Sequence, residues 1–496
     1  MLQAFMNVFT TLGDTVVVPV IIFIVALFLR VKPKTAMMSS LLVGVGLTGF
    51  GWIINAFTPV VTKIINQMIK NTGINLPVVD TGWQTSALAS FHSSVGISFF
   101  IIGLILEVIL FLIGYTKVFF PTNLWQNWGF MIWGAIAYTV TGNFWLSLGL
   151  SIFMMLYILV VAEIQADRYS DYFKISNGTT SALHNMENAV PAILLDPLWN
   201  LIGLNKLHLT PDVLKKKLGV FGEPTFIGAV LGIIIGFLGN FKHLGSLAAW
   251  GQILTFGVQL AAVMTIFPLV AHLFGNAFKP LTDEITERYS REKTQTTSED
   301  DALHSKKRWF LAVDDGVGYG ESATIISGVI LIPIVVILAF LLPGNKTIPV
   351  VDLVSIPFMV ESMVAIFRGN IAKIICTGTV WLGIGLYASS YMAPMYTEAV
   401  SHYGVAAATG AAMIVSFNVL ARPLNVVIFA AWTSGNPFWI GLTIAVYAVL
   451  QYLLRTRRPQ IWAYLKRMSE KNVSDDQPAK TNPTPAPSLA HQVQQS

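Results

Sequence analysis

Residues 97–114 are ISFFIIGLILEVILFLIG, and Glu107 is the only charged side chain in that stretch. A helix needs about 20 mostly apolar residues to cross roughly 30 Å of hydrocarbon, so this stretch is suited to spanning a bilayer. Residues 16–29 and 324–342 are similarly apolar. Across the 496 residues, 54% are apolar and 11% are charged, whereas ordinary soluble domains are roughly a quarter charged. The sequence therefore predicts an all-α polytopic membrane protein.

Twelve apolar runs are candidate spans: residues 13–30, 36–57, 93–115, 125–143, 145–163, 222–240, 247–273, 322–342, 350–367, 371–390, 404–421 and 437–454. Basic residues mark the cytoplasmic side of a membrane protein. They crowd residues 30–34 and 455–467, which predicts an external N-terminus and a cytoplasmic C-terminus. That orientation requires an odd number of crossings, so we expect about 11 transmembrane helices plus re-entrant hairpins. The run that does not cross is expected in the last third, where prolines and a glycine interrupt residues 421–437.

The predicted membrane domain covers residues 1–455, and a tail covers residues 456–496. Residues 279–309 are dense in acidic and basic side chains and are predicted to form a cytoplasmic loop. The tail is basic at first and then rich in Pro, Gln, Ser and Ala, which is typical of disorder.

Motifs of soluble enzymes are missing from the chain. It contains no G-x-x-x-x-G-K-[ST] phosphate loop and no H-E-x-x-H or paired-cysteine metal motif, so we expect no cofactor and no metal. The single cysteine, Cys376, lies in a predicted span, where a small buried apolar residue is expected. The net charge of +5 comes from loops and the tail and does not indicate nucleic-acid binding. A channel, a secondary transporter, or the membrane subunit of a larger system fits these features.

Polar side chains surround Asp80-Thr81-Gly82-Trp83, which precedes a row of hydroxyl-bearing residues. Asp80 and Trp83 would suit a polyol, because a carboxylate accepts hydrogen bonds from hydroxyls and an indole face covers C–H groups. The alternative is an interfacial tryptophan beside an ordinary helix start.

A second polar segment, His184-Asn185-Met186-Glu187-Asn188, lies just before Pro191 and an apolar run. Irregular backbone at membrane depth is tolerated where it is buried in protein or lines an aqueous cavity, and transporters place substrates at such breaks. His184, Asn185, Glu187 and Asn188 are therefore candidate sugar ligands at the tip of a re-entrant hairpin. An ordinary cytoplasmic loop is the alternative.

Two further carboxylates stand where loops enter apolar runs. Glu223 precedes Pro224, at a predicted helix start whose dipole stabilises negative charge. Asp314 opens the glycine-rich segment D-D-G-V-G-Y-G-E. Both are candidate sugar ligands, although a helix cap would explain Glu223 equally. Glu107 and Glu361 lie inside apolar runs, where ionisable groups are functional candidates by default. Pairing with a neighbouring helix is the alternative for both.

The chain resembles the membrane (IIC) component of galactitol-type permeases of the phosphotransferase system (PTS) over nearly all of residues 1–455. The matching motifs are Phe221-Gly222-Glu223-Pro224, Asp80-x-Gly82-Trp83, Pro343-Gly344-Asn345 with Asp352-Leu353, Arg368-Gly369-Asn370, and Asp314. The segment 184–188 and the residues after Trp83 depart from the family pattern, so the substrate is expected to be galactitol or a related polyol.

The resemblance implies a transport subunit that binds sugar outside the cell, while a phosphocysteine on a separate IIB subunit phosphorylates it in the cytoplasm. A IIA subunit would recharge IIB, since this chain has no phosphoryl-carrier residue of its own. By analogy with ascorbate permeases, the resemblance also implies a homodimer in the bacterial inner membrane, in contact with lipid. The competing hypothesis is a proton- or sodium-coupled secondary sugar transporter with Glu107 or Glu361 as its ion site.

Overall fold

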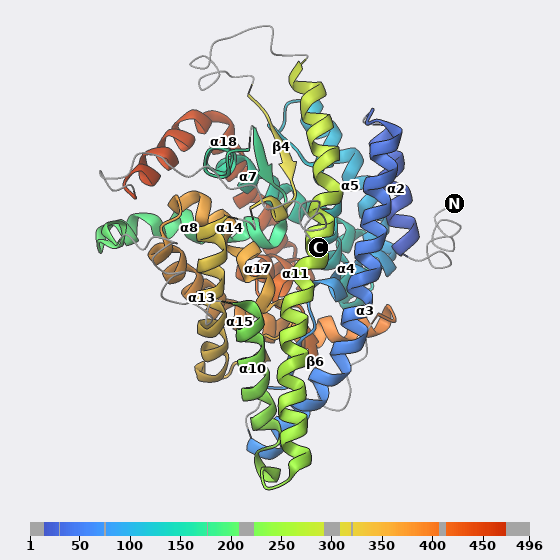
Figure 1. The fold of residues 1–496 in the computed structure, drawn as a ribbon. Coiled ribbons are helices and arrows are strands. Elements are labelled where there is room, and N and C mark those ends of the chain that lie inside the picture. The colour runs from blue at the N-terminus through green and yellow to red at the C-terminus, as the bar shows by residue number, and fades with distance from the viewer. Residues whose placement is uncertain are drawn as a thin grey trace, which may run out of the picture.

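The computed structural model describes residues 14–28, 30–73, 76–175, 177–207, 223–291, 308–318, 321–405 and 413–472. Helices dominate it (Figure 1). Within these residues, six helices are long and apolar enough to cross a membrane: Ser94–Leu112, Phe144–Phe173, Leu247–Ile266, Ser322–Leu341, Ile371–His402 and Pro437–Glu470. Shorter apolar helices accompany them. The predicted class, a helical polytopic membrane protein, is confirmed.

The chain contains two halves whose strands and long helices follow the same order, with differences among the short helices. The first half consists of α2 (Asp14–Phe28), α3 (Pro33–Thr72), β1 (Val78–Asp80), α4 (Trp83–His92), α5 (Ser94–Leu112), β2 (Val118–Phe119), η1 (Phe120–Asn127), α6 (Trp128–Thr141), α7 (Phe144–Phe173), β3 (Gly178–Thr180), α8 (Leu183–Leu201) and η2 (Leu204–Lys206). The second consists of α10 (Pro224–Gly239), η4 (Phe241–His243), α11 (Leu247–Arg291), β4 (Phe310–Val313), η5 (Asp315–Val317), α13 (Ser322–Leu341), β5 (Thr347–Ile348), η6 (Asp352–Ser355), α14 (Ile356–Phe367), α15 (Ile371–His402), β6 (Met413–Val415), α16 (Phe417–Leu420) and α17 (Pro423–Thr433). Helix α18 (Pro437–Glu470) follows.

Local details repeat as well as the element order. Asn143 caps α7 by accepting from Leu146 N, and Asn370 caps α15 by accepting from Lys373 N. A left-handed glycine precedes each cap. Tyr169 and Tyr396 follow these caps at equal spacing along α7 and α15. The two halves are therefore structural repeats, although their side chains differ at most positions.

The repeats run in opposite directions through the molecule. Helices α3 and α11 occupy equivalent places in the two halves and pack together. The backbone N–H of Lys32, just before α3, donates to Glu284 near the end of α11 (3.0 Å). The two helices are therefore antiparallel, which is the arrangement of the inverted repeats found in many transporters.

Two small parallel sheets interlock the halves. Their strand orders are β5-β1-β6 and β2-β4-β3. Each sheet takes its central strand from one half and both edge strands from the other, with Val79 opposite Ile348 and Ile414 in the first sheet. Neither half can complete its sheet alone. These strands were not predicted from the sequence, because two to four residues are too few to show an alternating pattern.

Helices α2, α3, α10 and α11 pack mainly against one another, whereas α4 to α8 and α13 to α17 form a second group with α18 against α7. Glycines bring α10 and α11 close together. A Cβ atom on Gly228, Gly232 or Gly236 would lie 2.9, 2.7 or 3.1 Å from a Cα atom of α11. This spacing of every fourth residue is the small-residue stripe that allows close helix packing in membranes.

Three predictions differ from the structure or lie partly outside the described residues. Residues 404–421 do not form a span, since their described part from Met413 is strand β6 and the four-residue α16. The charged segment 279–309 begins as a continuation of α11 to Arg291, and residues 292–307 lie outside the described residues. The tail is helical to Glu470, and its predicted disordered part, residues 473–496, also lies outside them.

Replacing Gly232 by Ala is expected to lower the free energy of unfolding by about 1–3 kcal/mol, because the added methyl group would overlap the α11 backbone. Gly251→Ala is the matched control, since a Cβ at Gly251 meets nothing within 4 Å. That control should be neutral or slightly stabilising, because alanine favours helix. The thermal unfolding midpoints of both detergent-solubilised variants measure the difference. Equal midpoints would contradict the close contact.

Candidate functional site

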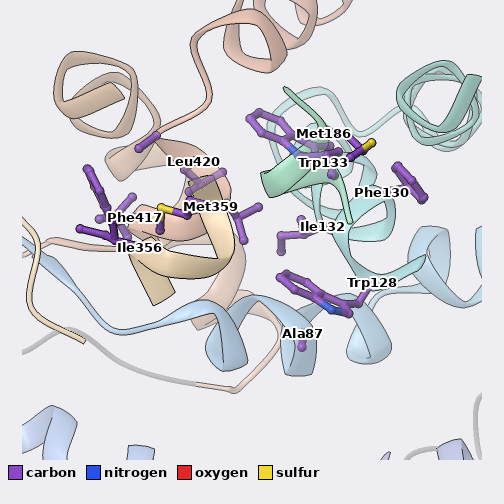
Figure 2. Packing of buried hydrophobic residues seen from close by; sticks show 14 of the residues in the cluster. Ala87, Trp128, Phe130, Ile132, Trp133, Met186, Ile356, Met359, Phe417 and Leu420 are labelled. Atoms are coloured by element: carbon purple, nitrogen blue, oxygen red, sulfur yellow. The ribbon is translucent and has the colours of Figure 1, made fainter. Parts of the chain in front are cut away.

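Three helices of the second group follow closely after strands. Helix α8 follows β3, and the short α16 and α17 follow β6. Two of these helices contain prolines: Pro191 and Pro197 lie inside α8, and Pro423 begins α17. The backbone there is enclosed by apolar side chains: Figure 2 shows Trp133 and Met186 on one side and Met359, Phe417 and Leu420 on the other, and all five are buried. Residues 184–188 lie in the first turns of α8, shortly after strand β3.

Asp80 binds backbone from three parts of the chain. Its Oδ1 accepts from Gly82 N (3.1 Å) and Phe417 N (3.0 Å), and its Oδ2 accepts from Val350 N (3.1 Å) and Asp352 N (2.6 Å). The side chain is fully buried. Since both oxygens already accept two bonds, Asp80 joins the strand ends of the first sheet in this conformation.

Asp352 completes the same junction. It accepts from Trp83 N (2.9 Å), Ser416 Oγ (2.9 Å) and Asn418 N (2.8 Å). The second sheet has a counterpart, in which Asn123 donates to Ser181 Oγ (3.1 Å) and to the carbonyl of Val313 (2.9 Å). These polar side chains therefore hold the strand ends where the two halves cross.

His184 forms a buried pair with Asp315. Its Nε2 lies 2.6 Å from Asp315 Oδ2, and Gln126 Nε2 donates to Asp315 Oδ1 (3.0 Å) and Asp314 Oδ2 (3.2 Å). The His184 ring stacks on Trp128 with centroids 6.3 Å apart, and Trp83 stacks on the same indole at 5.4 Å. The structure thus brings together three residues predicted from separate segments: Trp83, His184 and Asp314.

Asn185 and Glu361 lie beside this pair. Glu361 Oε2 accepts from Tyr169 Oη (3.0 Å) and Asn185 Nδ2 (3.0 Å), while Asn185 Oδ1 accepts from Ser362 N (2.9 Å). Glu361 Oε1 has no hydrogen-bond partner within the described part of the chain. A Cβ on Gly318 would lie 2.7 Å from the Glu361 carboxyl carbon, so a larger residue there would displace this carboxylate.

Glu187 and Arg422 occupy equivalent positions in the two repeats, each the seventh residue after its strand. Both are fully buried, and they attract each other electrostatically. Glu187 Oε1 accepts from Leu424 N (2.7 Å). Arg422 donates from Nε to the carbonyl of Asn418 (2.8 Å) and from one terminal nitrogen to the sulfur of Met359 (3.0 Å). Glu187 and Arg422 therefore connect α8 of the first half with the start of α17 in the second half.

Several buried polar atoms near this pair have no hydrogen-bond partner among the described residues: Asn188 Oδ1, Asn418 Oδ1, Arg422 Nη1, and both Nδ2 and Oδ1 of Asn425. An unsatisfied buried polar atom costs about 1–3 kcal/mol and requires an explanation such as a ligand. We call the eight residues His184, Asn185, Glu187, Asn188, Asp315, Glu361, Arg422 and Asn425 the polar centre.

The sequence did not single out Asp315 as a partner of His184, or Arg422 and Asn425 as ligands. A signal existed for Arg422, an arginine within the apolar last third next to Pro423. Glu223 stands apart from the polar centre in this conformation. It is exposed, caps nothing, and precedes α10, which packs on α11 and α3. Cys376 is partly exposed on α15 and not fully buried as expected.

Inverted repeats that enclose a buried polar centre are typical of membrane transporters. Residues 7–410 match the family described as the PTS system sugar-specific permease component (EIIC-GAT), and the chain belongs to that family. It is 25% identical over 444 residues to the PTS system galactitol-specific EIIC component of Escherichia coli (strain K12), covering 88% of this chain and 92% of that protein. The same figures hold for the protein of that name from Escherichia coli O157:H7. The predicted family is confirmed, and the chain is a sugar-specific PTS permease component.

Asp80→Asn is expected to destabilise the protein severely, because the new amide nitrogen would face backbone N–H donors. Two orphaned donors would cost roughly 2–6 kcal/mol in free energy of unfolding. Glu398→Gln is the matched control, a carboxylate-to-amide change at an exposed position. Membrane yield and unfolding midpoint measure the effect. A stable Asp80→Asn protein that had lost only sugar binding would instead favour the original assignment of Asp80 as a sugar ligand.

Proposed function

We propose that this chain imports galactitol or a closely related polyol and that the polar centre binds it. The phosphoryl donor is a separate IIB subunit, which a IIA subunit recharges. The names of the E. coli relatives support galactitol, and the unsatisfied atoms of the polar centre support a polyhydroxylated ligand. The latter observation carries the assignment of the site.

A polyol presents a hydroxyl on each carbon, and each hydroxyl both donates and accepts. The polar centre offers the complement: the amide oxygen of Asn188 can accept, a guanidinium nitrogen of Arg422 can donate, and Asn425 can do both. The amide oxygen of Asn418, next to the polar centre, can also accept. A bound polyol would satisfy these atoms without displacing an existing hydrogen bond. Trp83, which stacks on Trp128, remains the proposed cover for the C–H groups of the sugar.

His184 or a neighbouring carboxylate is the proposed acceptor of the hydroxyl proton. As the sugar oxygen forms its bond to phosphorus, the phosphorus–sulfur bond of the phosphocysteine breaks, and the hydroxyl proton moves to the acceptor. Asp315 orients the His184 ring through Nε2. Asp314 assists indirectly, because it shares Gln126 with Asp315. Glu223 stays a candidate contact for a second conformation, in which α10 would have to move.

The predicted orientation gains support from contacts among the basic segments. Lys32 contacts Glu284, Arg308 pairs with Asp167, and Arg458 pairs with Glu163. The first loop, the charged segment and the start of the tail thus lie with the C-terminal ends of α7 and α11, toward the top of Figure 1. By the positive-inside rule this end faces the cytoplasm of the bacterial cell.

A homodimer remains part of the proposal. The four-helix group α2, α3, α10 and α11 is the proposed dimerisation region, and the remaining helices form the substrate-binding core. Val16, Val20 and Ile24 expose an apolar face of α2 that would contact lipid or the second subunit.

Membrane vesicles loaded with phosphoenolpyruvate and the soluble PTS components test the proposed transport. Galactitol, or one member of a panel of pentitols and hexitols, should accumulate as its phosphate even when ionophores collapse the ion gradients. Uptake of unmodified sugar that stops with the ionophore would instead favour a secondary transporter.

Asn425→Ala tests the binding site without removing a side-chain contact that holds the fold, since both polar atoms of the amide lack partners. Equilibrium binding of labelled galactitol in detergent should weaken about tenfold or more, which is the loss expected for one or two hydrogen bonds. The unfolding midpoint should stay close to that of the unsubstituted protein. Asn71→Ala is the matched control, because Asn71 bonds Gly239 on α10, outside the polar centre. Unchanged binding by Asn425→Ala would place the sugar elsewhere.

A further inference from the structure

Two arginines meet at the C-terminal end of α14. Arg168 of α7 donates from Nη2 to the carbonyl of Ala365 (3.2 Å), and the backbone N–H of Arg368 donates to the same carbonyl (3.4 Å). Arg168 is also held by Asp171 through Nη1 (2.8 Å). The guanidinium of Arg168 and the backbone of Arg368 therefore meet at one helix end.

The two arginines differ in their surroundings: Arg168 is buried, whereas Arg368 is exposed. Arg168 is 2% exposed, its Nε has no hydrogen-bond partner among the described residues, and the charge of Arg368 repels it. Arg368 has a left-handed backbone (φ 52°), and its exposed side chain has no ion-pair partner in the described part of the chain. The negative end of the α14 dipole favours cations here. That effect is modest, and it leaves the unpaired nitrogen of Arg168 unexplained.

Further charged side chains of both signs surround the two arginines. Lys174 and Arg308 lie nearby, while Asp171 and Asp167 provide the matching negative charges. Glu321 accepts a hydrogen bond from Tyr172 Oη (2.9 Å), whose oxygen lies against Gly369. Acidic side chains are thus already engaged, whereas Arg368 remains free to bind an anion.

The inverted repeat provides an internal comparison. By the equivalence of the caps at Asn143 and Asn370, Arg168 corresponds to Met395 and Arg368 corresponds to Thr141. The scaffold therefore forms the same helix ends at the opposite side without arginine. Because the fold does not require these two charges, their presence on one side indicates a function specific to that side.

The arginines lie close to the polar centre. On α14, Glu361 accepts a hydrogen bond from Tyr169, and Ala365 accepts one from Arg168. Glu361 and Ala365 are one helical turn apart. One turn is about 5.4 Å. An anion held by the arginines would therefore be near the sugar, on the side where Arg308 and Arg458 gather.

We propose that Arg168 and Arg368 form the docking site for the dianionic phosphoryl group carried on the phosphocysteine of the partner subunit. Guanidinium groups suit this ligand because their planar forks bind phosphate oxygens in bidentate fashion. The arginines hold the group while its bond to sulfur breaks and its bond to the sugar oxygen forms. This inference rests on the proposed function, because it assumes phosphoryl transfer to a sugar in the polar centre.

The test measures galactitol phosphorylation by vesicles that expose the cytoplasmic face, at increasing concentrations of the phosphorylated IIB subunit of the same system. Arg368→Gln should raise the half-saturating concentration of that subunit about tenfold, the loss expected for one charge-assisted contact. Equilibrium binding of labelled galactitol should not change. Arg368→Lys should recover part of the loss, because lysine keeps the charge but not the fork.

Arg467→Gln is the matched control, since it removes an exposed positive charge from the basic end of α18. Equal half-saturating concentrations for Arg368→Gln and Arg467→Gln would overturn the docking site while leaving the proposed function intact. Failure of the unsubstituted protein to bind or phosphorylate any polyol would instead reject the proposed function, and the docking site with it.

Discussion

The four hydrogen bonds that Asp80 accepts are the constraint on which the rest of the structure depends. They join the loop before α4, the segment after β5 and the start of α16, so one carboxylate connects both halves of the chain. A buried carboxylate is stable only when its desolvation is offset by such donors. The donors are backbone groups, so their positions follow from the strand register. The junction therefore exists only when both halves are folded and interlocked.

The polar centre depends on this junction. Asp352, the neighbour of Asp80, binds the backbone N–H of Asn418 and thereby fixes the start of the segment that carries Arg422. In the second sheet, Asn123 binds Ser181 and fixes the start of the segment that carries His184 and Glu187. The sheets are small, but they determine where the broken helices begin. A substrate site made of broken helices needs such anchors, because the helices themselves cannot supply the missing backbone hydrogen bonds.

Much of the fold could be predicted from the sequence, since long apolar runs follow directly from the chemistry of the bilayer. Eleven of the twelve predicted runs coincide with helices, and only residues 404–421 do not. The grouping of Trp83, His184 and Asp314 was also predictable from polar residues beside breaks. The exchange of strands between halves was not, because pairing over hundreds of residues leaves no local pattern. The proximity of Arg422 to Glu187 could not be predicted for the same reason, because the two residues are far apart in the sequence. The backbone hydrogen bonds of Asp80 were not predicted either, because their donors also come from distant segments.

The charges of the polar centre bear on the direction of transport. The polar centre contains three carboxylates, Glu187, Asp315 and Glu361, and two basic side chains, Arg422 and His184. Carboxylates do not repel a neutral polyol, whereas they would repel a sugar phosphate that carries two negative charges. The arginines one turn away provide the opposite field. An inverted repeat by itself would treat the two sides of the membrane alike. With the sugar at the proposed site, the distribution of charge would remove that equivalence, because a sugar phosphate would bind the polar centre poorly and would be attracted to the side that carries the arginines.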